Sequence, residues 1–241
     1  MTHATALRPL HVAAAALLAL APMLAAAAAP PPYSAQYEVR RNGDRLGTAT
    51  VNFHRLDNGR YELVSDTVGS EGLAAIAGVS VNERSIIRWE AAPETVAYDF
   101  RQKLGWKSKT RTLQVDAAGG RVNGTDKEQP FSTAYEPGVL DRHAVVVALM
   151  SDLAGGRTGD LKYRIPDKGG VDTWTYRTGG SEQLQTPMGA QRALRVERIR
   201  QTNNGRSTTL WLSAEHNYVP LQILQREPGG ETIEMRITSL R

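Results

Sequence analysis

Pairs of turn-forming residues punctuate most of this chain, and they constrain its fold more than any other feature. Asn-Gly or Gly-Gly dipeptides recur from residue 42 to residue 230. Both central residues of a tight type I′ hairpin turn need positive φ angles, which Asn and Gly adopt at low cost. The pattern therefore predicts antiparallel hairpins rather than βαβ units. The dipeptides are Asn42-Gly43, Asn58-Gly59, Gly119-Gly120, Asn123-Gly124, Gly169-Gly170, Gly179-Gly180, Asn204-Gly205 and Gly229-Gly230.

The segments between these dipeptides alternate apolar and polar residues, as strands with one buried face do. A large curved antiparallel sheet, or an open barrel, buries all such faces together. The apolar sets that share a parity are Tyr37 and Val39; Ala49, Val51 and Phe53; Val96, Tyr98 and Phe100; Val219, Leu221 and Ile223; and Ile233, Met235 and Ile237.

Two stretches do not alternate in this way. Val139–Leu153 has apolar residues at helical spacing, Asp141 as a candidate N-cap and a Gly-Gly stop at 155–156, which predicts a buried helix across the dry face of the sheet. Gly69–Gly78 contains Leu73 and Ile76 between glycines. It has two interpretations: a lid that contacts a lipid tail, or a short helix that plugs the sheet.

The first 29 residues differ in composition from the rest. Arg8 precedes an apolar run, which ends in Ala25–Ala29 and is followed by Pro30-Pro31-Pro32. This pattern is typical of a cleaved signal peptide over 1–29, so we expect a periplasmic mature chain with no transmembrane segment. Residues 30–241 are predicted to form a single β-rich domain, and the best candidate for a subdivision is the segment 124–137.

The sequence lacks the motifs that disulfides, metal sites, nucleotide binding and the common catalytic mechanisms require. The chain has no cysteine and a formal net charge of +4, so disulfides and thiolate metal sites are excluded, and nothing calls for a nucleic-acid partner. His54, His143 and His216 are too far apart for a zinc motif. Motifs for a serine nucleophile, a dinucleotide or a nucleotide phosphate are missing. We therefore expect no cofactor, no metal and no enzymatic activity.

A row of cations surrounds one tryptophan. On one extended strand the five cations would share a face, and with a hairpin tip at Gly105-Trp106 they would still cluster on facing strands. Such a surface suits anionic lipid headgroups or lipopolysaccharide phosphates. The alternative is an edge strand protected by charge against further strand pairing. The cations are Arg101, Lys103, Lys107, Lys109 and Arg111.

Short motifs recur over most of residues 33–241. They are Tyr37 with Leu46-Gly47, Val139-Leu140-Asp141, Thr186-Pro187-Met188-Gly189, Leu210-Trp211-Leu212 and Val219-Pro220-Leu221, with Glu234 in the closing strand. Together these motifs resemble the bacterial exported-protein family called domain of unknown function 3108. The resemblance implies an exported β-rich envelope protein with a wide curved sheet around a helix, similar to lipocalins and lipoprotein carriers, and it supplies no catalytic residue.

These patterns support a non-enzymatic periplasmic protein that binds or carries an amphiphilic, lipid-like ligand. Its ligand site would include Leu73, Ile76, Trp106 and Trp211, and the cation row would hold the anionic headgroup. The first alternative is a structural or protein-interaction module of the envelope, which predicts a filled interior. The second is an envelope hydrolase, which requires at least two of Asp141, His143 and Glu234 to meet in a cleft.

Overall fold

The computed structural model describes residues 28–200, 202 and 205–241. The predicted signal peptide therefore lies almost entirely outside the described residues, as does part of the predicted turn at Asn204-Gly205. The described chain forms one sheet of 14 antiparallel strands. The strands of its first half are β1 (Tyr33–Arg41), β2 (Asp44–Arg55), β3 (Tyr61–Gly69), β4 (Ser80–Trp89), β5 (Pro93–Leu104), β6 (Lys107–Asp116), β7 (Arg121–Asp126) and β8 (Gln129–Ala134).

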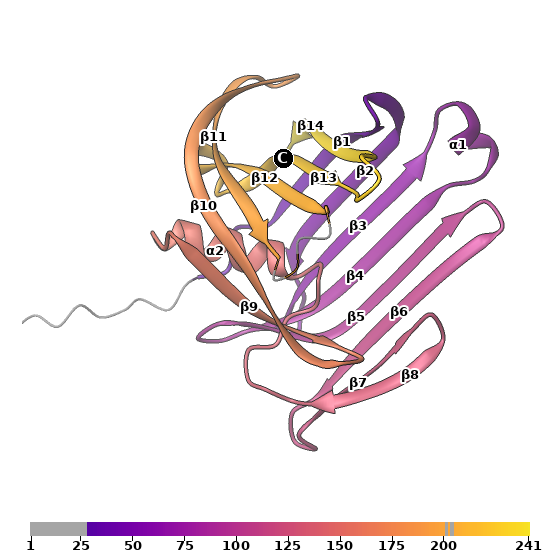
Figure 1. The fold of residues 1–241 in the computed structure, drawn as a ribbon. Coiled ribbons are helices and arrows are strands. Elements are labelled where there is room, and N and C mark those ends of the chain that lie inside the picture. Colours follow the sequence, from indigo (N-terminus) through magenta and orange to yellow (C-terminus); the bar gives the residue numbers. More distant parts are fainter. Residues whose placement is uncertain (1–27, 201, 203–204) are drawn as a thin grey trace, which may run out of the picture.

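The second half contributes six more strands. They are β9 (Asp160–Asp167), β10 (Gly170–Thr186), β11 (Gly189–Ile199), β12 (Ser207–Ser213), β13 (Val219–Arg226) and β14 (Thr232–Leu240). Each half is a run of hairpins between sequence neighbours, and β1 joins the halves by pairing with β14. The sheet curls until its two edge strands, β8 and β9, approach each other, which gives a nearly closed barrel (Figure 1). The predicted mainly β, antiparallel fold is confirmed.

Most of the predicted turns are turns, but two are not. Gly124 lies inside β7, where a Cβ would come within 2.4 Å of the Thr112 carbonyl oxygen, so this glycine permits a close approach of strands instead of a turn. Gly179-Gly180 lies inside β10, at a register shift between Thr178 and Ser181. These two glycines form a bulge that bends the long strand.

The predicted buried helix starts later than expected. Helix α2 spans Val145–Ala154, and Leu149, Met150 and Leu153 in it are at most 3% exposed. Asp141 still caps this region, because its Oδ1 accepts the backbone N–H groups of His143 and Ala144, both at 2.8 Å. The residues before Val145 form a turn instead of helix.

Those preceding residues close the opening between the edges of the sheet. The carbonyl of Val139 accepts the N–H of Thr95 in β5 at 3.0 Å, and the N–H of Leu140 donates to Arg164 in β9 at 2.8 Å. A backbone that pairs with two strands cannot also make helical hydrogen bonds, so Val139 and Leu140 are extended. The chain thus links the two halves on the inner side of the sheet.

The core fills the barrel with apolar side chains from both halves and from α2. Tyr37, Phe53, Leu63, Leu149 and Ile237 are at most 2% exposed, as the alternation of apolar residues predicts for the inner faces. A second, smaller cluster lies under β5–β7 and contains Tyr98, Leu113, Val122 and Val139.

The stretch Gly69–Gly78, which does not alternate apolar and polar residues, contains a five-residue helix, α1 (Gly72–Ile76). It joins β3 to β4 at the end of the sheet, on the right of Figure 1. Ala74 is buried against the sheet, whereas Ile76 is 84% exposed. Ile76 therefore does not plug the interior. The side chain of Leu73 lies outside what the structure describes.

Candidate functional site

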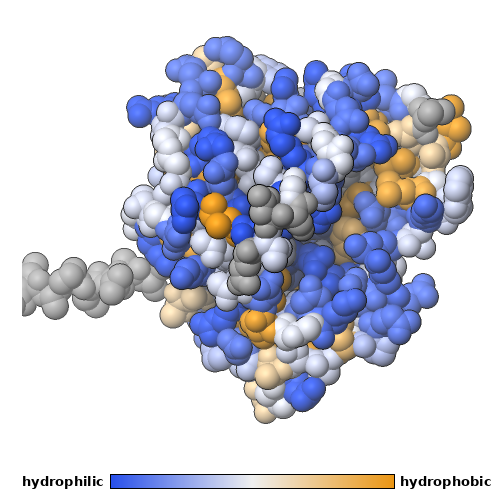
Figure 2. All heavy atoms as spheres, viewed as in Figure 1, coloured by the Kyte–Doolittle hydropathy of each residue, from blue (hydrophilic) through white to orange (hydrophobic). Residues whose placement is uncertain are grey.

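Exposed large hydrophobic side chains concentrate at one end of the sheet. Within the described residues, the large hydrophobic side chains classed as exposed are Val68 (52%), Ile76 (84%), Leu104 (47%) and Trp106 (93%). They come from the end of β3, from α1 and from the β5–β6 hairpin, which lie along the same edge of Figure 1. We call these four residues the tip surface. Figure 2 shows hydrophobic side chains on this rim, while much of the visible face is hydrophilic.

Strand pairing brings the tip surface together. Val68 pairs with Ser80, Ser80 with Lys103, and Lys103 with Ser108, so one row crosses β3, β4, β5 and β6. Neighbouring strands lie about 4.8 Å apart, which puts Val68 roughly 10 Å from Lys103. Gly105 and Trp106 form the turn that follows Lys103 and Leu104, and Gly105 has a φ of +64°. The turn projects Trp106 beyond the end of the sheet.

The predicted cation row divides between two faces of the sheet. Lys103 pairs with Ser108 and Arg101 with Thr110, whereas Lys109 pairs with Gln102. Because directly paired residues share a face, the two-residue turn places odd-numbered residues of β5 opposite even-numbered residues of β6. Arg101 and Lys103 therefore project from one face, and Lys107 and Lys109 project from the other. The alternative with a hairpin tip at Gly105-Trp106 is the one observed, and its four cations divide between the two faces of the sheet instead of sharing one.

Arg111 does not belong to this surface. Its side chain is 1% exposed and lies between β6 and β9, where it donates to the carboxylate of Asp167 at 3.2 Å and to the carbonyl of Pro166 at 3.1 Å. A second carboxylate, that of Asp126, lies 3.6 Å away, and the guanidinium stacks over the Phe131 ring at 5.4 Å. Arg111 is thus an internal link between the two halves of the sheet and cannot reach a headgroup.

A groove of about 330 Å³ runs beside Trp106. It is large enough for a small polar headgroup. Arg101 is 71% exposed at its side chain, with Asp99 as its partner at 3.0 Å. Hydroxyl groups, cations and the Trp106 indole line it together, a combination suited to a phosphate or sugar group. The groove is lined by Ser80, Asn82, Arg101, Gln102, Lys103, Gly105, Trp106, Lys107, Ser108 and Thr110.

Trp211 is separated from this surface. It lies in β12, half-buried on the outer side, and its Nε1–H donates to Glu182 in β10. Its neighbours Leu210 and Leu212 occupy the core instead. The structure therefore brings Trp106 and Ile76 to the same end of the sheet and leaves Trp211 in the other half.

Sequence reasoning missed a buried polar cluster around His143. The Nε2 atom of His143 lies 2.7 Å from Ser65 Oγ, and its Nδ1 lies 3.0 Å from Ser85 Oγ. Ser85 in turn donates to Asp141 Oδ1 at 2.9 Å. The sequence did contain a sign of this cluster. Ser65 and Ser85 are polar residues with the same parity as the buried residues Leu63 and Ile87, so they lie at core positions. We call Ser65, Glu83, Ser85, Asp141 and His143 the His143 cluster.

Burial shifts the pKa values in this cluster. It lowers the pKa of His143 to about 3. It also raises the pKa of Glu83 to about 7, with a further contribution from the negative charge of Asp141. The carboxylate oxygen of Glu83 lies 4.0 Å from His143 Nδ1. At neutral pH the imidazole is therefore uncharged and accepts or donates single hydrogen bonds.

The His143 cluster lacks the order of a catalytic triad. In a triad the carboxylate holds the histidine directly, and the histidine holds the nucleophile. Here Ser85 stands between Asp141 and His143, and the low pKa of His143 makes it a weak base at neutral pH. Glu234 lies elsewhere, beside Arg236 at 2.9 Å. The cluster fixes the Asp141 turn against β3 and β4.

The described residues form neither a metal site nor a membrane-spanning helix. Within residues 28–200, 202 and 205–241, no group of three His, Asp or Glu side chains is arranged to hold a metal ion. The helices of that part of the chain are also too short or too polar to cross a membrane.

The fold and tip surface define a class of protein: a nearly closed, single-sheet β-barrel with an exposed amphiphilic end. A family model described as "Protein of unknown function (DUF3108)" matches residues 36–238, so the chain belongs to this family. The family resemblance of the motifs is confirmed. A comparison with curated proteins gave no match.

The chain is similar to several solved structures at low sequence identity, and the first of them shows the same kind of fold. A β-barrel-like protein of domain of unknown function DUF1849 from Brucella abortus is 11% identical, with a TM-score of 0.56 over 88% of this chain and 98% of that one. The MucA/MucB complex of Pseudomonas aeruginosa is 10% identical, with a TM-score of 0.34 over 87% of this chain and 51% of that one. A lipoprotein from Parabacteroides distasonis has the same identity and TM-score and covers 87% and 95%.

Proposed function

We propose that this protein is a non-enzymatic, exported envelope protein that binds anionic lipid surfaces through its tip surface. The observation that carries the proposal is the gathering of Val68, Ile76, Leu104 and Trp106 at one end of the sheet. Scattered exposed hydrophobic residues need no explanation, but their collection at one end marks an interaction site. The export pattern of residues 1–29 supports a location where such lipids occur.

Charge favours an anionic bilayer surface as the binding partner. Lys103, Lys107 and Lys109 form no ion pair with the described residues, so these ammonium groups can pair with lipid phosphates. Each basic residue close to an anionic membrane contributes about 1 kcal/mol. Tryptophan prefers the boundary between headgroups and acyl chains, because its ring is apolar and its N–H is polar. Trp106 lies between Lys103 and Lys107 in the sequence. The hairpin therefore combines a side chain that prefers the membrane interface with cations that attract lipid phosphates.

The filled interior, which the interaction-module alternative predicts, argues against carriage inside a cup and for binding at the surface. Helix α2 and the core residues occupy the centre of the barrel, where Leu149 and Met150 are completely buried. Grooves of 190 to 500 Å³ lie at the surface and are lined by mixed polar and apolar side chains. A lipid chain enclosed by the sheet would have to displace α2. Insertion of the tip surface into a membrane requires no such rearrangement.

Vesicle sedimentation tests this proposal. The mature chain, residues 30–241, is mixed with vesicles of phosphatidylglycerol and phosphatidylcholine or of phosphatidylcholine alone. We expect binding that rises with the anionic fraction and falls with salt. Trp106→Ser should weaken it about 10-fold or more, because burial of a large apolar side chain contributes roughly 1.5–3 kcal/mol. In the double variant Lys103→Gln, Lys107→Gln, binding should rise less steeply with the fraction of phosphatidylglycerol.

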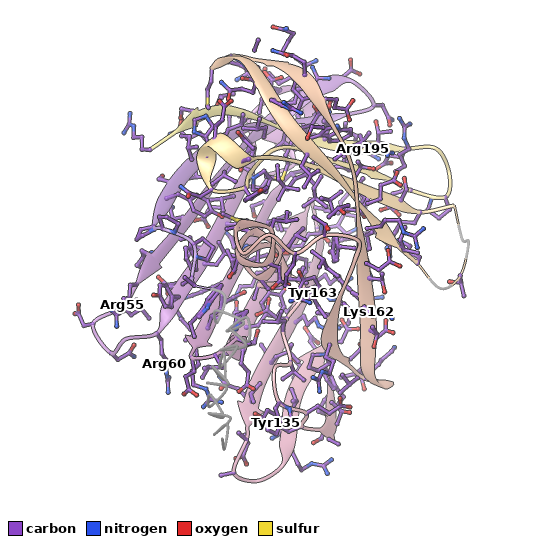
Figure 3. The ribbon with its side chains drawn as sticks, turned by 90° about the vertical axis from the view of Figure 1, so that its left-hand side faces the viewer. Arg55, Arg60, Tyr135, Lys162, Tyr163 and Arg195 are labelled. Atoms are coloured by element: carbon purple, nitrogen blue, oxygen red, sulfur yellow. The ribbon has the colours of Figure 1, made fainter. Side chains whose placement is uncertain are left out.

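The matched control is Lys162→Gln. Lys162 is exposed on β9 and lies in the other half of the sheet, as Figure 3 shows, so this variant should bind like the parent chain. Absence of binding to phosphatidylglycerol vesicles would refute the proposal, and so would binding that Trp106→Ser leaves intact. If the chain instead captured one envelope protein through the same residues, it would be an interaction module.

A further inference from the structure

A second polar groove adjoins the one beside Trp106. It has a volume of about 440 Å³ and shares Asn82 and Arg101 with the first groove of about 330 Å³. The two together extend across β3, β4, β5 and β6, which lie side by side in Figure 1, and we call them the outer groove. Each is in the size range of small-molecule sites. The second groove is lined by Val64, Asp66, Asn82, Glu83, Arg84, Asp99 and Arg101.

Strand pairing places polar side chains of the outer groove in one row across the sheet. Asp66 pairs with Asn82, and Asn82 pairs with Arg101. Arg101 pairs in turn with Thr110 on β6. The row faces outward, because successive residues of a strand alternate between faces and the odd-numbered Ser85 of β4 is buried. It spans three strand spacings, roughly 14 Å, so it can contact a ligand larger than a single ring.

Hydrogen bonds between neighbouring side chains hold these polar groups in place. Asn82 Nδ2 donates to Asp66 Oδ1 at 2.7 Å, and Arg101 Nε lies 3.0 Å from Asp99 Oδ1. One such bond uses only part of the capacity of each group, since a carboxylate has two oxygens and an amide has a carbonyl oxygen and two N–H donors. Side chains that are already ordered lose little freedom when a ligand binds, so the row is prepared for one.

The charges of the second groove favour a neutral ligand. Asp66 and Asp99 place two carboxylates in its lining. The lining residue Arg84 is neutralised by Glu62, whose Oε1 accepts from Arg84 Nε at 2.6 Å. A phosphate bound at Asn82 would stand beside the carboxylates and be repelled. A sugar hydroxyl is uncharged and both donates and accepts hydrogen bonds, so it can bind amide, carboxylate and guanidinium groups together.

We propose that the outer groove binds a neutral oligosaccharide. Asp66 and Asn82 bind sugar hydroxyls at one end, and the hydroxyls of Ser80 and Ser108 add further donors and acceptors along the groove. Trp106 lines the other end, where its indole offers a flat apolar surface to the face of a sugar ring. The site goes beyond the proposed membrane binding and does not depend on it, because a soluble oligosaccharide needs no bilayer.

Titration of the ¹⁵N-labelled mature chain, residues 30–241, with soluble tetrasaccharides tests the site by NMR spectroscopy. The probes are maltotetraose, which is built of glucose, and tetraacetylchitotetraose, which is built of N-acetylglucosamine. With at least one of them we expect saturable shifts of the amide signals of β3–β6. The double variant Asp66→Ala, Asn82→Ala should bind about 10-fold more weakly, because it loses several hydrogen bonds to the sugar.

Asn123→Ala is the matched control. Asn123 is an exposed asparagine of β7 whose Oδ1 accepts from Ser132 at 2.7 Å, and it lines neither part of the outer groove. This variant should bind the tetrasaccharide like the parent chain. Circular dichroism and the melting temperature show whether each variant is folded. Absence of shifts with both tetrasaccharides, or equal affinity of the folded double variant and the parent, would overturn the proposal.

Two further measurements separate the oligosaccharide site from membrane binding. The double variant Asp66→Ala, Asn82→Ala should sediment with phosphatidylglycerol vesicles like the parent chain, and a parallel loss of vesicle binding would overturn a separate site. An octyl glycoside of the bound sugar, kept below its critical micelle concentration, distinguishes the sources of the sugar. Tighter binding than the free sugar, reversed by Ile76→Ser, identifies a glycolipid headgroup, and equal binding identifies a free glycan.

Discussion

Arg111→Met should destabilise the fold strongly, although it removes only one charged group. Methionine keeps most of the apolar stem of the arginine side chain. The change in stability therefore measures mainly the contribution of the guanidinium group. Arg111 is 1% exposed and supplies hydrogen bonds to Asp167 and Pro166, which lie in the opposite half of the sheet. Breaking a buried pair by removing one partner costs about 3–5 kcal/mol. Asp167 is 39% exposed and can regain water, so we expect about 2–4 kcal/mol.

Urea unfolding at pH 7, followed by circular dichroism, measures this loss of unfolding free energy. Arg101→Met is the control on the same hairpin: its side chain is 71% exposed, so the expected change is within about 0.5 kcal/mol. A double-mutant cycle with Asp167→Asn should give a coupling free energy above roughly 1 kcal/mol. If Arg111→Met unfolds like the parent chain, Arg111 does not link the two halves and the reasoning fails.

Two further predictions concern pH dependence and strand packing. Glu83 has a pKa raised to about 7 by burial and by Asp141, so the folded state binds the proton more tightly than the unfolded state, and stability should fall as pH rises from about 4.5 to 7. In urea titrations across this range Glu83→Gln should remove that fall; an unchanged slope would contradict the assignment. Gly47→Ala should lower the melting temperature sharply, since a Cβ there would lie 1.9 Å from the Val68 carbonyl oxygen. Gly169→Ala, with nothing within 4 Å of its Cβ, should melt like the parent, and similar melting of both variants would refute the close approach.

Local patterns predicted the strands and their faces well. Tyr37, Val39 and Phe53 are buried as their parity predicts, because the two-residue period of a strand depends only on neighbouring positions. Gly124 was misread for the same reason. A glycine serves a turn or a close approach equally well, and only the neighbouring strand shows that Thr112 and Phe131 lie against it.

The cation row shows where local reasoning stops. Lys103 and Lys107 share a parity in the sequence, but the two-residue turn between them reverses which parity faces which side. The partners of Arg111 come from β7 and β9, so its burial follows from the curl of the whole sheet. The half-buried position of Trp211 likewise depends on Leu210 and Leu212 taking the core side.

Most hairpins, the inward faces of the strands, the helix before Gly155 and the family can be read from the amino-acid sequence alone. These properties depend on backbone preferences and on contacts within a few residues. The folded chain alone shows that Ser65, Ser85 and His143 meet, and that Arg111 contacts Asp167. The first group joins two strands to the turn before α2, and the second joins β6 to β9. Both depend on how far a 14-stranded sheet twists and closes, which no short stretch of sequence encodes.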